Sequence, residues 1–281
     1  MRGILAAKAN LSFRSLAADP SLLLQCSEHM CNEAPGALWT RFTVSYNLYA
    51  GSIVALGSDA QREQLFASQS ELGCFAFTEK GAGVLSGAGV ETTATYDAKT
   101  DSFVIHSPTP SSHKVWISQG MHAEHAVILA ELIIAGEKHG PHLFWARIAN
   151  RSATRSAKSA TKPVKGVTPS SLPPKSALNG LDNAFIAFDN FVVPRSGLLS
   201  RFCTVKEGGD YSLNLPNGVD RMLDLLISRL LTGRICLSEG TIGYALALLR
   251  RSWSHCAERE VSYSWTNQAL GYLGHLLTDC L

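Results

Sequence analysis

The chain has 281 residues, of which 46% are hydrophobic and 17% are charged, and its formal net charge is +2. This composition is typical of a globular protein with a buried core and excludes a disordered chain. The small net charge gives no support for nucleic acid or an acidic membrane surface as a partner. Seven scattered cysteines without a Cys-x-x-Cys pair argue against a disulfide framework or a zinc ribbon and favour a reducing compartment.

Targeting signals are not evident. The N-terminal apolar run is interrupted by Lys8 and Arg14, which is unlike the core of a signal peptide. No apolar run approaches the roughly 20 residues that a membrane-spanning helix needs. The C-terminal Asp279-Cys280-Leu281 differs from a peroxisomal Ser-Lys-Leu address. We therefore expect an intracellular protein without a membrane span.

The first segment, residues 1–70, is predicted to be helical. Apolar residues recur at helical spacing between Val44 and Leu65. Ser58 and Asp59 are typical of a helix N-terminus and predict a short helix over residues 60–66.

The middle segment, residues 71–205, is predicted to be a sheet. Its apolar, β-branched and aromatic runs predict strands at residues 74–78, 90–96, 102–106, 114–118, 126–130, 143–148, 184–189 and 191–194. Strands this close together, without helices between them, favour an antiparallel sheet or barrel. Residues 151–176 are rich in Ser, Lys, Pro and Thr and are predicted to form an exposed loop. Seven basic and no acidic residues lie between Arg147 and Lys175, which is most simply a solvated loop.

The last segment, residues 206–281, is predicted to be helical again after Gly218. One apolar helix face is expected from Leu223, Leu226, Ile227, Leu230 and Leu231. A further short helix is expected over residues 266–281. The predicted fold is therefore α+β, with an N-terminal helical segment, a central antiparallel β-barrel and an incomplete, truncated C-terminal helical bundle.

Three motifs in the sequence have spacings similar to those of known chemical sites. Gly81, Gly83 and Gly87 resemble a dinucleotide-binding loop, but a strand instead of a helix follows them, so no helix N-terminus faces a phosphate. The pairs His122/His125 and His139/His142 have three-residue spacing, which places the two side chains on opposite faces of a strand. We therefore predict no metal site and interpret these histidines as surface or turn residues. Ser86 lacks the glycine two positions earlier that a nucleophile elbow needs.

Several segments, taken in order, resemble one enzyme superfamily. They are residues 73–83 (GCFAFTEKGAG), 91–97 (ETTATYD), 114–118 (KVWIS), 180–189 and 193–195, and the Gly233-Arg234 pair, which is expected to open a long helix that carries Gly243. This set is similar to the acyl-CoA dehydrogenase and oxidase superfamily, and closer to the acyl-CoA oxidases. The resemblance implies a helical domain, a β-barrel and a helical bundle, with FAD between barrel and helices. It also implies an acyl-CoA substrate, a homodimer and a peroxisomal location.

The resemblance also implies roles for four residues. Thr78 would hydrogen-bond the flavin ring, Trp116 would pack beside that ring, and Ser118 would donate near its N5 or O4 edge. Arg259 falls where the family has an arginine that reaches the FAD diphosphate of the partner subunit. For Thr78 and Trp116, each taken alone, ordinary barrel packing is the alternative.

The implied activity introduces a 2,3-trans double bond into acyl-CoA and passes electrons from FAD to O₂, giving hydrogen peroxide. The family's catalytic glutamate has no match here, so no catalytic residue is assigned. At the alternative position, on the helix before the arginine, this chain has Gly233, and Glu239 lies on another helix face. The alternative is a non-catalytic or truncated member that binds FAD or a partner. Acyl-chain length and the electron acceptor stay open at this point.

Overall fold

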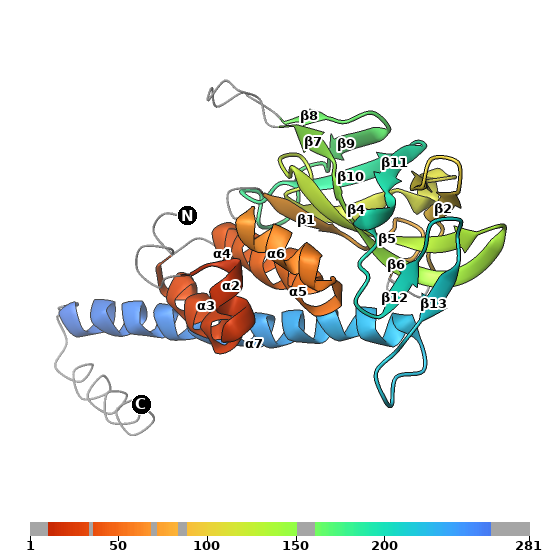
Figure 1. Cartoon of the computed structure of the whole chain (residues 1–281). Coiled ribbons are helices and arrows are strands. Elements are labelled where there is room, and N and C mark those ends of the chain that lie inside the picture. Colours follow the sequence, from red (N-terminus) through yellow and green to blue (C-terminus); the bar gives the residue numbers. More distant parts are fainter. Residues whose placement is uncertain (1–10, 34–35, 69–71, 84–88, 151–160, 260–281) are drawn as a thin grey trace.

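The computed structural model describes residues 11–33, 36–68, 72–83, 89–150 and 161–259, and it shows helices before and after a central region of sheet (Figure 1). The helices are α2 (Phe13–Ala18), α3 (Ser21–Glu33), α4 (Gly36–Thr43), the π-helix η1 (Val44–Ala50), α5 (Gly51–Leu56), α6 (Asp59–Ala67) and α7 (Met222–Glu258), with short 3-10 turns η3 (Pro110–Ser112) and η4 (Arg195–Gly197). The predicted helix–sheet–helix order is confirmed.

The strands fall into several sheets. They are β1 (Gly73–Ala76), β2 (Thr93–Asp97), β3 (Ser102–His106), β4 (Lys114–Ser118), β5 (His125–Ile134), β6 (Glu137–Arg147), β7 (Ala149–Asn150), β8 (Lys162–Pro163), β9 (Val167–Ser171), β10 (Asn183–Phe188), β11 (Phe191–Pro194), β12 (Cys203–Val205) and β13 (Tyr211–Leu213). The largest sheet has the order β1-β5-β2-β3-β11, with β6 also paired to β5, and a second sheet has the order β4-β10-β9. β7 pairs with β8, and β12 pairs with β13.

The prediction of a closed antiparallel barrel is wrong. β5 pairs in parallel with β1 along its first half, and in parallel with β2 along its second half. Its other edge pairs antiparallel with β6. Because one long strand supports two short strands end to end, the sheet curls without closing. The predicted loop at residues 151–176 also contains strands β8 and β9, while residues 151–160 lie outside the described part.

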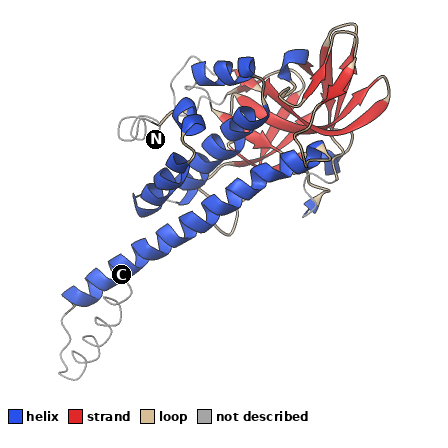
Figure 2. Ribbon diagram, turned by 60° about the horizontal axis from the view of Figure 1, so that its bottom comes forward, coloured by secondary structure: helices blue, strands red, loops and turns tan. Residues whose placement is uncertain are grey.

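The long helix α7 runs past the N-terminal helices and reaches the sheet (Figures 1 and 2). Two of its glycines let neighbours approach closely. A Cβ at Gly240 would lie 2.3 Å from the Trp39 ring, and one at Gly243 would lie 2.9 Å from Cys31 Cβ. α7 is the described part of the predicted C-terminal bundle, and the helix expected over residues 266–281 lies outside the described residues. Among the described helices, none combines the length and hydropathy required to cross a membrane.

The π-helix η1 connects the helical layer to the sheet. Tyr49 on η1 is buried beneath Gly73 of β1, where a Cβ would lie 2.3 Å from the tyrosine ring. The Tyr49 hydroxyl accepts a hydrogen bond of 3.0 Å from the Trp145 indole on β6. η1 is therefore fixed against two strands, and π-helical turns of this kind occur often at functional sites.

Candidate functional site

A cavity of about 270 Å³ lies where η1, β1, β4 and α7 meet. Its lining residues are mostly apolar: Val44, Leu48, Phe75, Phe77, Thr78, Trp116, Ile117, Ser118 and Leu230. Three of the four predicted site residues, Thr78, Trp116 and Ser118, line this cavity. Mostly apolar walls with a few polar groups are typical of sites for small molecules and cofactors.

Trp116 is the unusual residue of this site. Its φ is +61°, in the left-handed region, and its residue surface is 58% exposed although it lies within strand β4. The pairing of β4 with β10 shifts register between Ala184 and Ile186, so a bulge accompanies the irregular backbone. A bulky residue with positive φ is rare, and bulges re-aim side chains next to active sites. The bulge therefore presents the indole at the cavity instead of packing it into the sheet.

Asn183 on β10 fixes the end of β4 behind the cavity. Its amide nitrogen Nδ2 donates to the Trp116 carbonyl at 3.3 Å and to Ser118 Oγ at 3.1 Å. Because the Ser118 oxygen accepts this bond, its own proton is left for another acceptor. Ser118 is thus held as a donor at the cavity wall.

A buried ion pair connects the segments that carry Thr78 and Trp116. Lys114 Nζ lies 2.8 Å from Glu79 Oε1 and 2.6 Å from the Leu129 carbonyl, and both side chains are almost fully buried. Glu79 also accepts from the amides of Glu91 and Thr92, at 2.8 and 3.1 Å. The pair therefore joins the segment after β1 to strands β4 and β5. It also holds the residues that directly precede β2.

The two charges of this pair shift each other's titration. Burial lowers the pKa of Lys114 to about 8, although the neighbouring Glu79 carboxylate opposes this shift. Burial alone would raise the pKa of Glu79, but Lys114 and the donating amides outweigh it and hold that pKa below its usual value. Glu79 is therefore an anion whose charge is compensated inside the protein, and it is not a free base.

A second polar contact holds η1 against the end of β4. The buried Gln119 has a φ of +70°, and its amide nitrogen donates to Ser45 Oγ at 3.0 Å. The Ser45 hydroxyl in turn lies 3.2 Å from Gln119 Oε1. Sequence reasoning missed both Gln119 and the Lys114–Glu79 pair. The one available signal was a polar residue inside or directly after an apolar strand run.

Arg259, the fourth predicted site residue, lies elsewhere. It is exposed and follows the C-terminal end of α7, whereas Leu230 near the start of that helix lines the cavity. Twenty-nine residues of helix separate the two, which corresponds to about 44 Å. The structure thus does not bring Arg259 to this cavity within one chain.

Gly233 is the position where the resemblance implies an alternative base, and the structure shows its surroundings. Gly233 on α7 faces η1, where a Cβ would lie 3.6 Å from Asn47 Nδ2 and 3.8 Å from Leu48 Cδ2. None of the described residues that line the cavity carries a carboxylate. Among the described residues, the cavity walls therefore supply no carboxylate as a proton acceptor.

The histidine pairs form no metal site within the described residues, where no group of three potential ligands occurs. Their interpretation as surface or turn residues is wrong for His125 and His142, which are buried. His142 Nε2 lies 3.0 Å from the Tyr211 hydroxyl and its Nδ1 lies 3.0 Å from the Gly140 carbonyl. Strand β13 contacts β6 through this hydrogen bond. The interpretation of these histidines as surface or turn residues does not anticipate it.

Comparison with known proteins identifies relatives that match most of this chain. No family model matches the chain. Peroxisomal acyl-coenzyme A oxidase 1 of Rattus norvegicus is 33% identical over 215 residues, covering 74% of this chain and 31% of the rat protein. The acyl-coenzyme A oxidase-like protein of Mus musculus is 31% identical over 247 residues, covering 84% of this chain and 38% of the mouse protein.

Solved structures of acyl-CoA oxidases are also similar to this chain. Acyl-CoA oxidase 1 from Yarrowia lipolytica matches with a TM-score of 0.69 and 25% identity, over 90% of this chain and 36% of that one. Acyl-CoA oxidase-2 of Caenorhabditis elegans, bound with FAD, ascaroside-CoA and ATP, matches with a TM-score of 0.62 and 27% identity, over 78% of this chain and 34% of that one. The fold and the ordered motifs define an acyl-CoA oxidase-like protein.

The chain belongs to the acyl-CoA oxidase family. It spans about a third of the length of the curated relatives that it matches.

Proposed function

We propose that this chain is an acyl-CoA oxidase-like flavoprotein of peroxisomal fatty-acid β-oxidation, and that the cavity at Trp116 receives the isoalloxazine ring of FAD. The observation that carries the proposal is that Thr78, which follows β1, and Trp116 and Ser118 of β4 line one cavity. Relatives named as peroxisomal acyl-coenzyme A oxidases, and a neighbour crystallised with FAD, support it.

The cavity suits a flat ring. Its volume of about 270 Å³ is at the lower end for ligand pockets, so it fits a ring system and leaves the rest of a dinucleotide outside. The exposed indole of Trp116 offers a flat contact surface, and the stacked rings of Phe75 and Phe77 line the same space. These features match an aromatic cofactor better than a peptide or a metal ion.

In this proposal the chain's residues bind and polarise. Thr78 and Ser118 hydrogen-bond the polar edge of the ring, and the Ser118 proton is directed there because Asn183 donates to its oxygen. The buried Lys114–Glu79 pair keeps the Thr78 and Trp116 segments in register. When bound, FAD would accept a hydride from the β-carbon of an acyl-CoA thioester and pass electrons to O₂, giving a 2,3-trans-enoyl-CoA and hydrogen peroxide.

One observation favours the alternative of a member that binds FAD without turnover. The described cavity walls contain no carboxylate, and Gly233, the position where the resemblance implies an alternative base, has no side chain to supply one. Removal of an α-proton without a positioned base loses about 10² to 10⁴-fold in rate. In this alternative the chain would bind FAD or a partner without catalysing the reaction.

The test is the absorption spectrum of the full chain with added FAD, before and after acyl-CoA is added without oxygen. A bound flavin that is bleached supports the oxidase, and a bound flavin that stays oxidised supports the alternative. A chain that binds no FAD contradicts the oxidase and the FAD-binding form of the alternative. Trp116→Ala is expected to weaken FAD binding, whereas Val192→Ala, which shortens an exposed apolar side chain on β11 that lies neither at this cavity nor on α7, serves as the control.

A further inference from the structure

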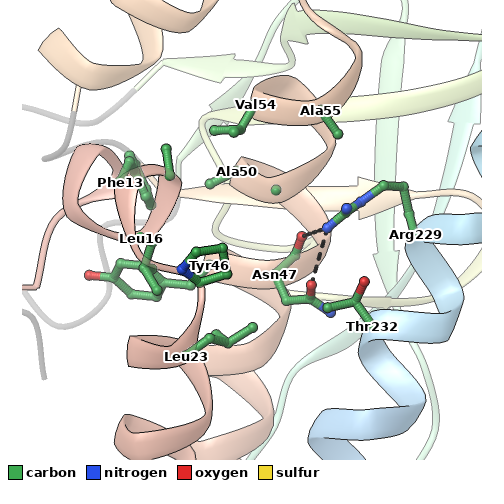
Figure 3. Close-up of a pocket in the computed structure, with 13 residues that line it drawn as sticks. Phe13, Leu16, Leu23, Tyr46, Asn47, Ala50, Val54, Ala55, Arg229 and Thr232 are labelled. Carbon is green, nitrogen blue, oxygen red and sulfur yellow. Dashed lines mark hydrogen bonds between the residues drawn. The ribbon is translucent and has the colours of Figure 1, made fainter. Parts of the chain in front are cut away.

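A second cavity of about 250 Å³ lies on the other side of η1, between α2, α3, α5 and α7 (Figure 3). Its walls are largely apolar side chains, among them Phe13, Leu16, Leu23, Tyr46, Ala50 and Val54. The helix η1 thus separates two cavities: Val44 and Leu48 line the first, while Tyr46 and Ala50 line the second. The sequence predicted no role for the residues that line this second cavity.

One wall of this second cavity carries a cation. Arg229 of α7 lines the cavity, and its Nη2 donates to the Asn47 carbonyl at 3.4 Å and to Asn47 Oδ1 at 3.3 Å (Figure 3). Among the described residues, no carboxylate lines the cavity or pairs with Arg229, and both Arg229 Nε and Asn47 Nδ2 are buried without a hydrogen-bond partner. Burial lowers the pKa of Arg229 below its ordinary value.

An unneutralised guanidinium in this position is costly. Arg229 is only partly buried, so its guanidinium loses part of its hydration, and hydrogen bonds or an anion can compensate for that loss. Two long bonds to neutral oxygens satisfy only part of the five-donor fork. The arrangement therefore favours an anion that enters from the cavity.

We propose that this second cavity binds a medium-chain aliphatic monocarboxylate, with its carboxylate at Arg229 and its chain among the apolar walls. A guanidinium binds a carboxylate through two parallel hydrogen bonds, and the Thr232 hydroxyl on the same wall supplies a further donor. The single cation at the described walls matches one negative charge, whereas a phosphate monoester carries about 1.5 to 2.

The size of the cavity limits the chain. A volume of about 250 Å³ holds roughly eight groups of the size of a water molecule, at about 30 Å³ each. A saturated chain of about eight carbons fills this space. Binding of a carboxylate in this cavity does not require FAD on the other side of η1.

The test is calorimetric titration of the full chain with octanoate, and with octanol as a neutral probe of equal length. We expect saturable binding of one octanoate, and affinity for octanol at least about tenfold lower, as follows from losing a charge-assisted hydrogen bond. Arg229→Gln should weaken octanoate binding by a similar factor. The matched control, Arg250→Gln, removes an exposed arginine from the same helix and should leave binding unchanged.

A second variant covers the case in which Arg229→Gln does not fold. Val54→Phe fills the cavity without touching the cation, and it is expected to abolish octanoate binding while circular dichroism shows a folded protein. Octanoate binding that withstands Val54→Phe in a folded protein would overturn the proposal. Equal affinity for octanol and octanoate, or no octanoate binding by the unaltered chain, would overturn it as well.

Discussion

The buried pair of Lys114 and Glu79 shows what a single residue contributes here. The two residues lie 35 positions apart in the sequence, and their side chains are 0% and 2% exposed. Removing one partner leaves an uncompensated buried charge, so Lys114→Met or Glu79→Gln alone should lower the free energy of unfolding by about 3–5 kcal/mol. The double variant should recover part of this loss, because neither charge then remains.

Urea denaturation of the four proteins of this cycle measures the effect. Additive losses in the double variant would contradict a direct interaction between the two side chains. The sequence did not predict the pair because strand patterns identify which residues are polar but not which of them meet. The same limit applies to Asn183 and Gln119, which reach the site from different elements.

His142 provides a pH-dependent effect. Burial lowers the pKa of His142 to about 4, and His139 nearby adds to this shift, while the bond to Gly140 opposes it. An unfolded histidine has a pKa of about 6.5, so the unfolded chain binds the proton first as the pH falls. The stability contributed by neutral His142 is therefore complete above about pH 6.5 and decreases toward about pH 4.

We expect the free energy of unfolding to fall by up to about 1.4 kcal/mol per pH unit from this residue across that window. His142→Gln should show a shallower pH dependence between about pH 6.5 and 5, measured by denaturant unfolding at each pH. Tyr211→Phe is the control, since it removes the hydrogen-bond partner and keeps the titrating ring. An equally steep dependence in His142→Gln would assign the effect to other groups.

Among the elements, helix α7 contains glycines in two different environments. A Cβ at Gly233 would make ordinary contacts of 3.6 and 3.8 Å, whereas one at Gly240 would lie 2.3 Å from the rigid Trp39 ring. Gly233→Ala should therefore stabilise the protein by about 0.5–1 kcal/mol through helix propensity. Gly240→Ala should destabilise it, because the indole must move.

Thermal unfolding of the two variants checks this prediction, and each serves as the control for the other. A lower melting temperature for Gly233→Ala would show that the space beside Asn47 and Leu48 is smaller than the structure indicates. The same two contacts make Gly233 the position to test for a restored base, since they border the first cavity through Leu48.

Element boundaries show where local sequence signals are sufficient. Ser58 was predicted to begin a helix, and the structure confirms a capping box in which Ser58 and Gln61 bond each other's backbone amides. The strands at residues 102–106, 114–118 and 191–194 also match their predictions. The bulge at Trp116 was not predicted, because a positive φ at tryptophan has no local signal and is imposed by pairing with β10.

At the scale of the whole molecule, the sequence predicted the order of helices and sheet but not which strands pair in the sheet. Antiparallel neighbours were expected from the short spacing between strands, yet β5 pairs in parallel with both β1 and β2. Pairing partners depend on long-range contacts that strand spacing does not encode. The same limit applies to the site. Thr78, Trp116 and Ser118 were predicted from the sequence and line one cavity, but the polar residues that hold them were found only in the structure.

The predicted apolar face of the last helix is split in the structure. Leu226 is buried against the fold, whereas Ile227 and Leu231 are 37% and 56% exposed. Further exposed apolar residues continue this stripe along α7: Ile235, Ile242, Leu249 and Trp253. At about 100° per residue, the six side chains fall within an arc of about 80°. A contiguous apolar stripe of this kind marks an interaction surface.

We expect this stripe to pair with the same stripe of a second copy, which is the homodimer that the family resemblance implies. Burial of the remaining exposed apolar surface of both stripes would favour association and oppose the entropy cost of pairing. A two-fold axis across α7 would place each stripe against its own copy. Leu231→Glu with Ile242→Glu should therefore convert dimers into monomers in sedimentation velocity experiments.

Arg251→Glu is the matched control, because it places the same new charge on an exposed position of α7 outside the stripe. It should leave the sedimentation coefficient of the dimer unchanged. A chain that is monomeric at all concentrations, or a dimer that persists in the Leu231→Glu/Ile242→Glu variant, would assign the stripe to a different occupant. Because neither stripe position lines either cavity, ligand binding by the monomeric variant then separates assembly from site formation.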